Sequence, residues 1–240
     1  GIDKFNDYCR TSVLKYTEEW RSYITRQARW VDFDNDYKTL DTDYTESVLW
    51  AFSELYKKGL IYEGFKVLAY CWRCETPLSN HELRMDDEVY KNRQDQTLTV
   101  TFPVSAGQKL EGVRLLAWTT TPWTLVSNTA VAVHPDVTYV AVQTTVEEVT
   151  EVLVVAEPLL ASVAGEQKIL KTMLGKELER TTYKRPLDLI EIPDSHFVVL
   201  ATYVTTEDGT GLVHQAPAFG ADDLQVCRGY GLPVVNPIAP

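Results

Sequence analysis

Residues 118–128, Trp-Thr-Thr-Thr-Pro-Trp-Thr-Leu-Val-Ser-Asn, decide how the rest of the chain is interpreted. They overlap the end of the apolar run 113–118, whose β-branched and aromatic content predicts a buried strand. Pro122 has no backbone N–H, so strand pairing should end there and leave three threonines where the strand opens into a loop. Three hydroxyl groups, with the amide of Asn128 nearby in the sequence, predict a small uncharged polar pocket. For any single threonine, the alternative is an ordinary strand residue.

Residues 205–223 form a second informative stretch, Thr-Thr-Glu-Asp-Gly-Thr-Gly-Leu-Val-His-Gln-Ala-Pro-Ala-Phe-Gly-Ala-Asp-Asp. Acidic residues and glycines at 207–211 favour a turn, after which a short strand should carry His214 to its end. Gly220 and the two aspartates that follow it are typical of the start of a helix. Either these carboxylates merely favour the positive end of that helix, or one of them projects towards His214.

Together the two stretches resemble the signature motifs of the editing domain inserted into isoleucyl-tRNA synthetases, which are class I enzymes. The resemblance covers most of the chain and includes the segments Trp30-Val-Asp-Phe, Thr76-Pro-Leu-Ser-Asn and Ala130-Val-Ala-Val-His-Pro. The related valyl and leucyl enzymes usually carry Thr-Arg-Pro after the threonine cluster, whereas Thr121 here directly precedes Pro122, as in the isoleucyl branch. Val126 departs from the family pattern, because many members have proline at that position.

We expect an α+β fold. A chain of 240 residues with 45% hydrophobic content can bury a substantial core. Helical periodicity at 11–28 and at 43–59 predicts two helices in the first part of the chain. From about residue 94, short β-branched runs separated by Gly, Pro, Asp or Asn predict a mainly β, barrel-like domain with helical additions. The expected strands are 97–104, 113–119, 129–133, 138–143, 152–156 and 197–204, and the expected additional helices are 157–163 and 221–228.

The resemblance also implies a domain division. Residues 1–92 would be a helical portion of the nucleotide-binding α/β catalytic domain with its connecting stem, and residues 93–240 the editing domain, incomplete at its C-terminus. The family's adenylate-forming motifs do not occur in the sequence, so ligase activity itself is not expected from this fragment.

Charge and hydropathy limit the classes of partner. A formal net charge of −11 argues against a general nucleic-acid binder, although a site that receives only the single-stranded end of an RNA needs few phosphate contacts. Residues 168–185 are a local basic exception, interpreted either as a solvated strand-and-turn face or as a place for RNA backbone contacts. No apolar run approaches the roughly 20 residues that span a bilayer, and no secretory signal is evident, so we expect a cytoplasmic location and no membrane partner.

Cys71-Trp-Arg-Cys74 is the third candidate motif. Two thiolates at this spacing can hold a zinc ion as half of a tetrahedral site, which needs two further ligands. Free structural cysteines are an alternative, and a redox pair would normally open a helix, whereas Pro77 follows here. By the resemblance, we expect half of a structural zinc site whose second pair of cysteines lies beyond Pro240.

The sequence has no Gly-x-Ser-x-Gly motif and no catalytic cysteine signature, so water is the expected nucleophile. The resemblance implies post-transfer editing, the hydrolysis of the ester in mischarged valyl-tRNA(Ile), within an isoleucine–tRNA ligase that charges tRNA(Ile) with isoleucine using ATP. Asp223 would bind the ammonium group of the amino acid. His214 would wall the side-chain pocket, hold the ribose or position the water. The implied catalytic residues are Thr120, Thr121, His214 and Asp223, and the implied substrate-binding residues are Trp118, Thr119 and Asn128.

The implied partners are the 3′ end of tRNA(Ile) carrying valine and the remainder of the synthetase, in a monomer. Editing should need no cofactor, while ATP and magnesium belong only to the full-length enzyme. Two other classes of function stay open on the sequence. One is a non-catalytic module that binds the tRNA end or a protein, and the other is a structural metal module organised by Cys71 and Cys74.

Overall fold

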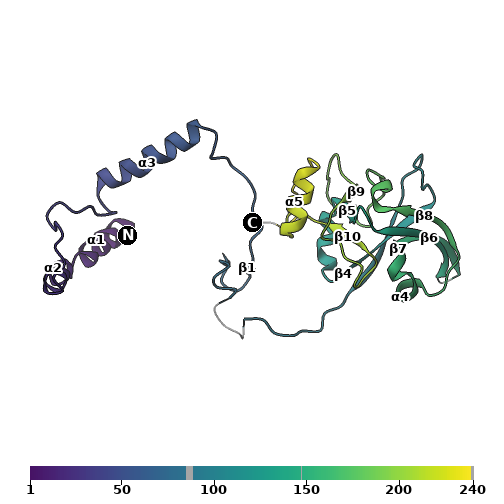
Figure 1. The fold of residues 1–240 in the computed structure, drawn as a ribbon, viewed down its shortest axis with the longest axis horizontal. Helices are drawn as coiled ribbons and strands as arrows, with labels where there is room; N and C mark the ends of the chain where they lie inside the picture. Colours follow the sequence, from purple (N-terminus) through teal and green to yellow (C-terminus); the bar gives the residue numbers. More distant parts are fainter. Residues whose placement is uncertain (85–88, 147, 239–240) are drawn as a thin grey trace. The chain divides into compact units, whose positions relative to one another are not determined.

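The computed structural model describes residues 1–84, 89–146 and 148–238, and the chain divides into two compact units, residues 1–64 and 65–240 (Figure 1). Unit 1–64 contains the helices α1 (Ile2–Val13), α2 (Thr17–Arg26) and α3 (Thr42–Lys57). All residues of these three helices are described, and none of them is buried. Their apolar side chains are exposed instead, Trp20 by 61% and Trp50 by 67%. The first part of the chain is thus helical, as predicted, but its helices enclose no hydrophobic core of their own.

The helix predicted at 11–28 is wrong in its bounds, because the chain breaks between α1 and α2. The backbone N–H of Thr17 and its hydroxyl both donate to the carbonyl of Leu14, at 3.2 and 2.8 Å. A threonine that bonds in this way to the preceding turn offers the backbone an alternative to a continuous helix. The second predicted helix is α3, and Gly59 lies just after its C-cap at φ 69°, the left-handed conformation that commonly ends a helix.

Unit 65–240 is mainly β, and the α+β fold class is confirmed. Its strands are β1 (Tyr70–Cys71), β2 (Thr76–Pro77), β3 (Leu98–Pro103), β4 (Val113–Thr119), β5 (Ala130–Val133), β6 (Thr138–Val146), β7 (Val149–Ala156), β8 (Ile169–Leu174), β9 (Phe197–Leu200) and β10 (Leu212–Gln215). Its helices are the 3₁₀ turns η1 (Pro122–Ser127), η2 (Glu157–Leu159) and η3 (Gly175–Glu177), and the α-helices α4 (Leu160–Ala164) and α5 (Ala221–Gly229).

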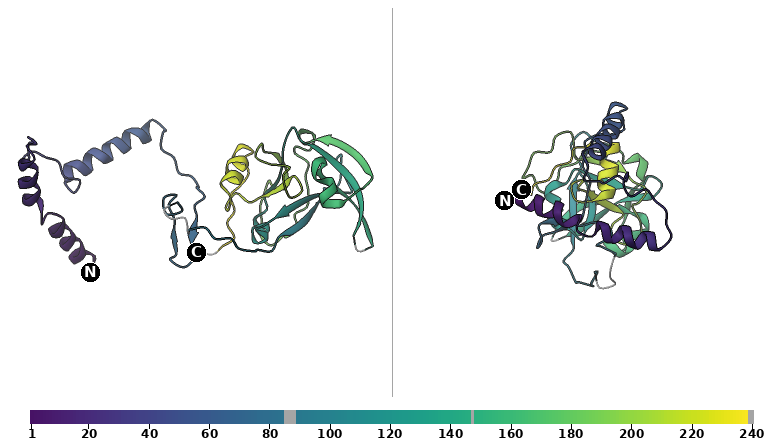
Figure 2. Two further views of the ribbon diagram at one scale, coloured as in Figure 1. Left: turned by 60° about the horizontal axis from the view of Figure 1, so that its bottom comes forward. Right: turned by 90° about the vertical axis from the view of Figure 1, so that its left-hand side faces the viewer.

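The described strands form the β1-β2 hairpin, a three-stranded sheet in the order β10-β5-β9 and a five-stranded sheet in the order β3-β4-β7-β6-β8. Neighbours pair in antiparallel fashion except β4 with β7 and β5 with β9, which are parallel. The barrel-like arrangement therefore consists of two sheets, and the strands within the described ranges do not close into one barrel. Figures 1 and 2 place α5 at one end of this unit and β6 to β8 at the other.

Strand β5 shows how the layers pack. Val131 and Val133 belong to a hydrophobic core that includes residues of both sheets, whereas Ala130 and Ala132 belong to a second core that contains Cys227 of α5. Successive side chains of a strand point to opposite faces, so the sequence Ala-Val-Ala-Val serves two layers at once. The three-stranded sheet is thus packed between the five-stranded sheet and α5. No helix within the described ranges is long and apolar enough to cross a membrane.

Candidate active site

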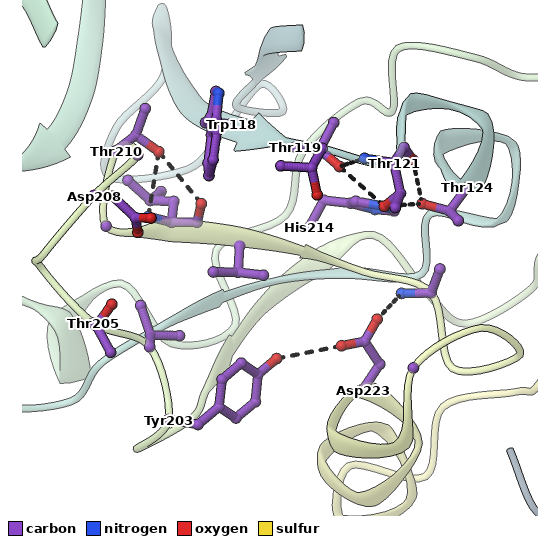
Figure 3. A pocket seen from close by; sticks show the side chains of 18 of the residues that line it. Trp118, Thr119, Thr121, Thr124, Tyr203, Thr205, Asp208, Thr210, His214 and Asp223 are labelled. Carbon is purple, nitrogen blue, oxygen red and sulfur yellow. Dashed lines mark hydrogen bonds between the residues drawn. The ribbon is translucent and has the colours of Figure 1, made fainter. Parts of the chain in front are cut away.

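The ends of β4 and β10 and the start of α5 border a cavity of about 480 Å³ (Figure 3). The predicted site residues that line it are Trp118, Thr119, Thr120, Thr121, His214 and Asp223. Asn128, the remaining residue predicted for catalysis or substrate binding, does not line the cavity; it is fully buried and contacts His214. The two sequence motifs, which come from different sheets, therefore meet at one site.

The turn after β4 holds the threonine cluster in place. Pro122 is the first residue of η1, where the lack of a backbone N–H costs no intrahelical hydrogen bond. The Thr119 hydroxyl accepts the backbone N–H of Thr121 at 3.1 Å, and the hydroxyl oxygens of these two residues are 3.3 Å apart. Thr124 donates its hydroxyl to the carbonyl of Thr121 at 2.8 Å. Thr120 is exposed and lines the cavity, so the hydroxyl-rich strand exit predicted from the sequence is present.

His214 reaches the cavity from β10, where it pairs with Val131 of β5. Its side chain is almost fully enclosed, with 7% of the residue exposed. The ring nitrogen Nε2 lies 2.7 Å from the hydroxyl of Thr124, and Nδ1 lies 3.2 Å from the amide nitrogen of Asn128. Burial lowers the pKa of His214 from 6.5 to about 4, because an enclosed imidazole loses the solvation that would stabilise its charge. The ring is therefore neutral at physiological pH.

Asp223 projects into the cavity from the first turn of α5, whereas Asp222 beside it is exposed. One carboxylate oxygen of Asp223 accepts the backbone N–H of Ala216 at 2.8 Å, and the other lies 3.4 Å from the hydroxyl of Tyr203, towards which it points in Figure 3. Burial raises the pKa of Asp223, and the hydrogen bond from Ala216 opposes that shift. Gly220 allows this geometry, since a Cβ there would lie 2.8 Å from the carboxyl carbon of Asp223.

The cavity favours cationic groups over anionic ones. Asp208 and Asp223 contribute carboxylates to the lining, and no lysine or arginine belongs to the lining among the residues that the structure describes. A half-buried carboxylate such as that of Asp223 is a strong partner for an ammonium group, because a charge-assisted hydrogen bond is about twice as strong as a neutral one. The same wall carries neutral hydroxyl groups, which can orient a water molecule or a sugar.

Three further residues of the site, Thr124, Tyr203 and Tyr183, were not predicted from the sequence. Thr124 follows Thr121 by three residues in a 3₁₀ turn, where side chains three apart lie on the same side. This spacing could have predicted that Thr124 joins the threonine cluster. Tyr203 lines the cavity because β9 ends at Leu200, four residues before the predicted end. Tyr183 reaches Asn128 across 55 positions of sequence, and no local pattern signals such a contact.

Cys71 and Cys74 lie apart from these residues, in the β1-β2 hairpin and its turn. Both are free thiols, and the Cys71 sulfur accepts the backbone N–H of Cys74 at 3.4 Å. This hydrogen bond lowers the pKa of Cys71, and the hydrogen bond between the two side chains raises that of Cys74. No group of three or more potential ligands was found in the described part of the chain, so the hairpin offers two ligands and does not by itself fit a closed zinc site.

Comparison with known proteins identifies similar sequences over nearly the whole chain. The family model for class I tRNA synthetases (I, L, M and V) matches residues 1–203. An isoleucine–tRNA ligase from Mycobacterium tuberculosis (strain CDC 1551 / Oshkosh) is 56% identical over 246 residues, which cover 99% of this chain and 23% of the relative. An isoleucine–tRNA ligase from Leifsonia xyli subsp. xyli is 49% identical over 267 residues, with 98% of this chain and 24% of the relative covered. The chain thus spans about a quarter of the length of these relatives.

Solved structures show a more distant likeness. The crystal structure of GlLeuRS-CP1 gives a TM-score of 0.45 at 21% identity and covers 60% of this chain and 69% of that one. The editing domain of the cytosolic leucyl-tRNA synthetase of P. knowlesi gives a TM-score of 0.46 at 16% identity and covers 59% of this chain and 66% of that one.

Proposed function

Because the chain belongs to the class I tRNA synthetases for isoleucine, leucine, methionine and valine, we propose that its cavity hydrolyses the ester of mischarged valyl-tRNA(Ile). The chain would be the part of an isoleucine–tRNA ligase that removes wrongly attached valine, while the whole ligase charges tRNA(Ile) with isoleucine using ATP. Its partners would be the 3′ end of tRNA(Ile) and the rest of the synthetase, in a cytoplasmic monomer. The high identity to isoleucine–tRNA ligases supports the isoleucine assignment.

The observation that carries the proposal is the shared cavity of Thr120, His214 and Asp223. Asp223, in its ionised form, binds the ammonium group of valine and so fixes the ester carbonyl. The oxygen of a water molecule attacks that carbonyl carbon, the bond between carbon and the ribose oxygen breaks, and the ribose oxygen takes up a proton as tRNA leaves. An activated ester requires positioning more than a strong nucleophile, and the hydroxyl groups of Thr119 to Thr121 supply contacts to the terminal adenosine and to the water.

A second site of this kind answers a physical limit on selection. One methylene separates isoleucine from valine and is worth only about 1 to 3 kcal/mol of discrimination, a limit for which isoleucyl-tRNA synthetases are the standard example. A hydrolytic pocket that admits valine and excludes the larger side chain rejects the error by size. Val213, Tyr203 and Phe219 are among the residues of the cavity lining with large apolar groups, and we expect them to set this size limit.

Substitution of Asp223 by alanine tests the proposal. The variant should release valine from valyl-tRNA(Ile) at least about 100-fold more slowly, since a half-buried charged partner of the substrate is lost. The matched control is Asp222→Ala, which removes the neighbouring carboxylate that is exposed on the same helix turn. Release of valine and of isoleucine from the respective tRNAs is measured with the ligase that carries this chain.

Equal rates for Asp223→Ala and the unchanged protein would show that the assigned role is wrong. If neither protein releases valine, but both retain tRNA that ends in adenosine better than tRNA that lacks it, the chain is a non-catalytic module for the tRNA end.

A further inference from the structure

Tyr183 begins a line of hydrogen bonds that ends in the cavity. It is buried, with 3% of the residue exposed, and its ring packs edge-to-face against Phe102 at 5.2 Å between centroids. The Tyr183 hydroxyl donates to the side-chain oxygen of Asn128 at 2.7 Å. Asn128 in turn lies against His214, so a residue outside the cavity lining is connected to one inside it.

The contacts of Asn128 fix which way its amide points. Its amide nitrogen lies 3.0 Å from the backbone carbonyl of Ala130, which can only accept a hydrogen bond. The nitrogen therefore cannot be exchanged with the side-chain oxygen without placing two acceptors against each other. One N–H of the amide donates to Ala130, and the other is directed to Nδ1 of His214 at 3.2 Å. Nδ1 must accept that bond, so it carries no proton.

The contacts at Nε2, on the other side of the His214 ring, require the same protonation state. The hydroxyl of Thr124 has a single proton, which it donates to the carbonyl of Thr121 at 2.8 Å. Its oxygen then accepts from Nε2 of His214 at 2.7 Å, which requires a proton on Nε2. Two independent sets of contacts therefore select the neutral ring with its proton on Nε2. A doubly protonated ring would direct an N–H at the amide N–H of Asn128.

We propose that Tyr183 and Asn128 are positioning residues that hold His214 as the Nε2-protonated neutral tautomer and thereby prevent it from acting as the general base in hydrolysis. Nδ1 is engaged as an acceptor and Nε2 as a donor, so abstraction of a proton from water by this ring would first require a hydrogen bond to break. The ring instead fixes the Thr124 hydroxyl, and through it the carbonyl of Thr121. The statement about the tautomer stands on contacts alone, whereas its catalytic consequence rests on the proposed function.

The ring-nitrogen resonances of the ¹⁵N-labelled chain test the tautomer without any activity measurement. The chain has four histidines, so the His214→Gln variant identifies the signals of His214 by their loss. We expect a protonated Nε2 and an unprotonated Nδ1 at neutral pH. A proton on Nδ1, or on both nitrogens, would overturn the inference.

Tyr183→Phe tests the role of the tyrosine while keeping the ring that packs on Phe102. Loss of the hydroxyl leaves the Asn128 oxygen without its donor, so the amide is held only through Ala130. Its hydrogen bond to Nδ1 should weaken, and the His214 ring signals should shift. The maximal rate of valine release should fall roughly three- to tenfold, the ratio expected for one buried hydrogen bond, with little change in KM. Tyr230→Phe is the matched control, because its hydroxyl bonds to Glu179 and to the backbone N–H of Leu200, apart from the cavity lining.

Asn128→Asp provides a second variant of nearly the same shape. A carboxylate accepts where the amide donates, so the proton should move to Nδ1 of His214, and Nε2 should become the nitrogen that can accept a proton. If both Tyr183→Phe and Asn128→Asp leave the ring signals unchanged, the positioning roles are wrong. If the signals respond as expected but the unchanged protein releases no valine, the tautomer inference holds and the proposed function fails.

Discussion

At the scale of single residues, the buried position of His214 links stability to pH. Burial lowers the pKa of the folded ring from 6.5 to about 4, so between these values the unfolded chain binds a proton that the folded chain does not. The stability that depends on the neutral ring is complete above pH 6.5 and is lost as the pH falls towards 4. At 1.36 kcal/mol per pKa unit, the loss is about 3 kcal/mol.

Urea unfolding at about pH 7 and about pH 4.5 measures this effect. The unchanged chain should lose more free energy of unfolding between the two pH values than His214→Gln does. Asp223 acts in the opposite sense, because its raised pKa contributes stability at low pH that is lost as the pH rises through the folded pKa. Asp223→Asn should therefore lose more free energy of unfolding between about pH 7 and about pH 4.5 than the unchanged chain does. Equal losses in all three proteins would contradict both assignments.

The sequence could indicate single residues of the site only where the signal was local. Thr119, Thr120 and Thr121 stand between a strand and a proline, and that local pattern favoured a polar pocket. Asp223 was distinguished from Asp222 only by the family resemblance, because both stand in the first turn of the same helix. Tyr183 and Tyr203 could not be found in this way. Each acts through a side-chain hydroxyl that meets a partner from a distant segment, and the residues around them show no unusual pattern.

At the scale of elements, the turn before β10 depends on Gly211. It has φ 75°, and a Cβ at this position would lie 2.3 Å from the Cβ of Ala156 at the end of β7. The backbone N–H of Ala156 donates to the carbonyl of Thr210 at 2.9 Å, and Tyr139 donates its hydroxyl to the carbonyl of Gly211 at 2.8 Å. The cavity wall is therefore held against the five-stranded sheet at a point with no room for a side chain.

Gly211→Ala should lower the free energy of unfolding by about 2 to 4 kcal/mol, from the strain of positive φ together with the clash. Gly107→Ala is the matched control, because Gly107 has φ 79° but no heavy atom within 4 Å of the added Cβ. The control should cost about 1 to 2 kcal/mol, the cost of placing a residue with a Cβ in the left-handed region. Urea unfolding of both variants measures the difference, and equal losses would show that the contact with Ala156 relaxes freely.

Strand positions followed well from β-branched runs, whereas strand partners did not. The predicted strands 113–119 and 129–133 correspond to β4 and β5 within a residue. Their parallel pairing with β7 and β9 joins segments separated by long connections, and periodicity carries no information on partners. For the same reason, regular short strands suggested a barrel but could not show that they divide between two sheets.

At the scale of the whole molecule, the two units differ in the source of their stability. Every residue of α1 to α3 is unburied, whereas the second unit contains two hydrophobic cores. Deletion of residues 1–64 should therefore leave the midpoint of thermal unfolding of residues 65–240 unchanged within about 2 °C. Near-UV circular dichroism follows the aromatic residues of that unit through the transition. A fall of more than about 5 °C, which corresponds to roughly 2 kcal/mol for a domain of this size, would show that the helices support the cores.

The division at residues 92 and 93 remains a prediction from the family resemblance, as does the editing role of residues 93–240. A net charge of −11 was compatible with a tRNA partner only if the site receives one strand end, and the carboxylates of the cavity lining suit an ammonium group carried on such an end. Whole-chain composition could limit the classes of partner but could not place them, because placement depends on which side chains gather at one surface.

The cavity takes one wall from β4 of the five-stranded sheet and another from β10 of the three-stranded sheet. A ligand that contacts both walls therefore links the two sheets. Ligand binding should then stabilise both sheets at once. A non-cleavable aminoacyl-adenosine mimic should slow amide hydrogen exchange in the three-stranded and the five-stranded sheet together, whereas without the ligand the two sheets should exchange independently.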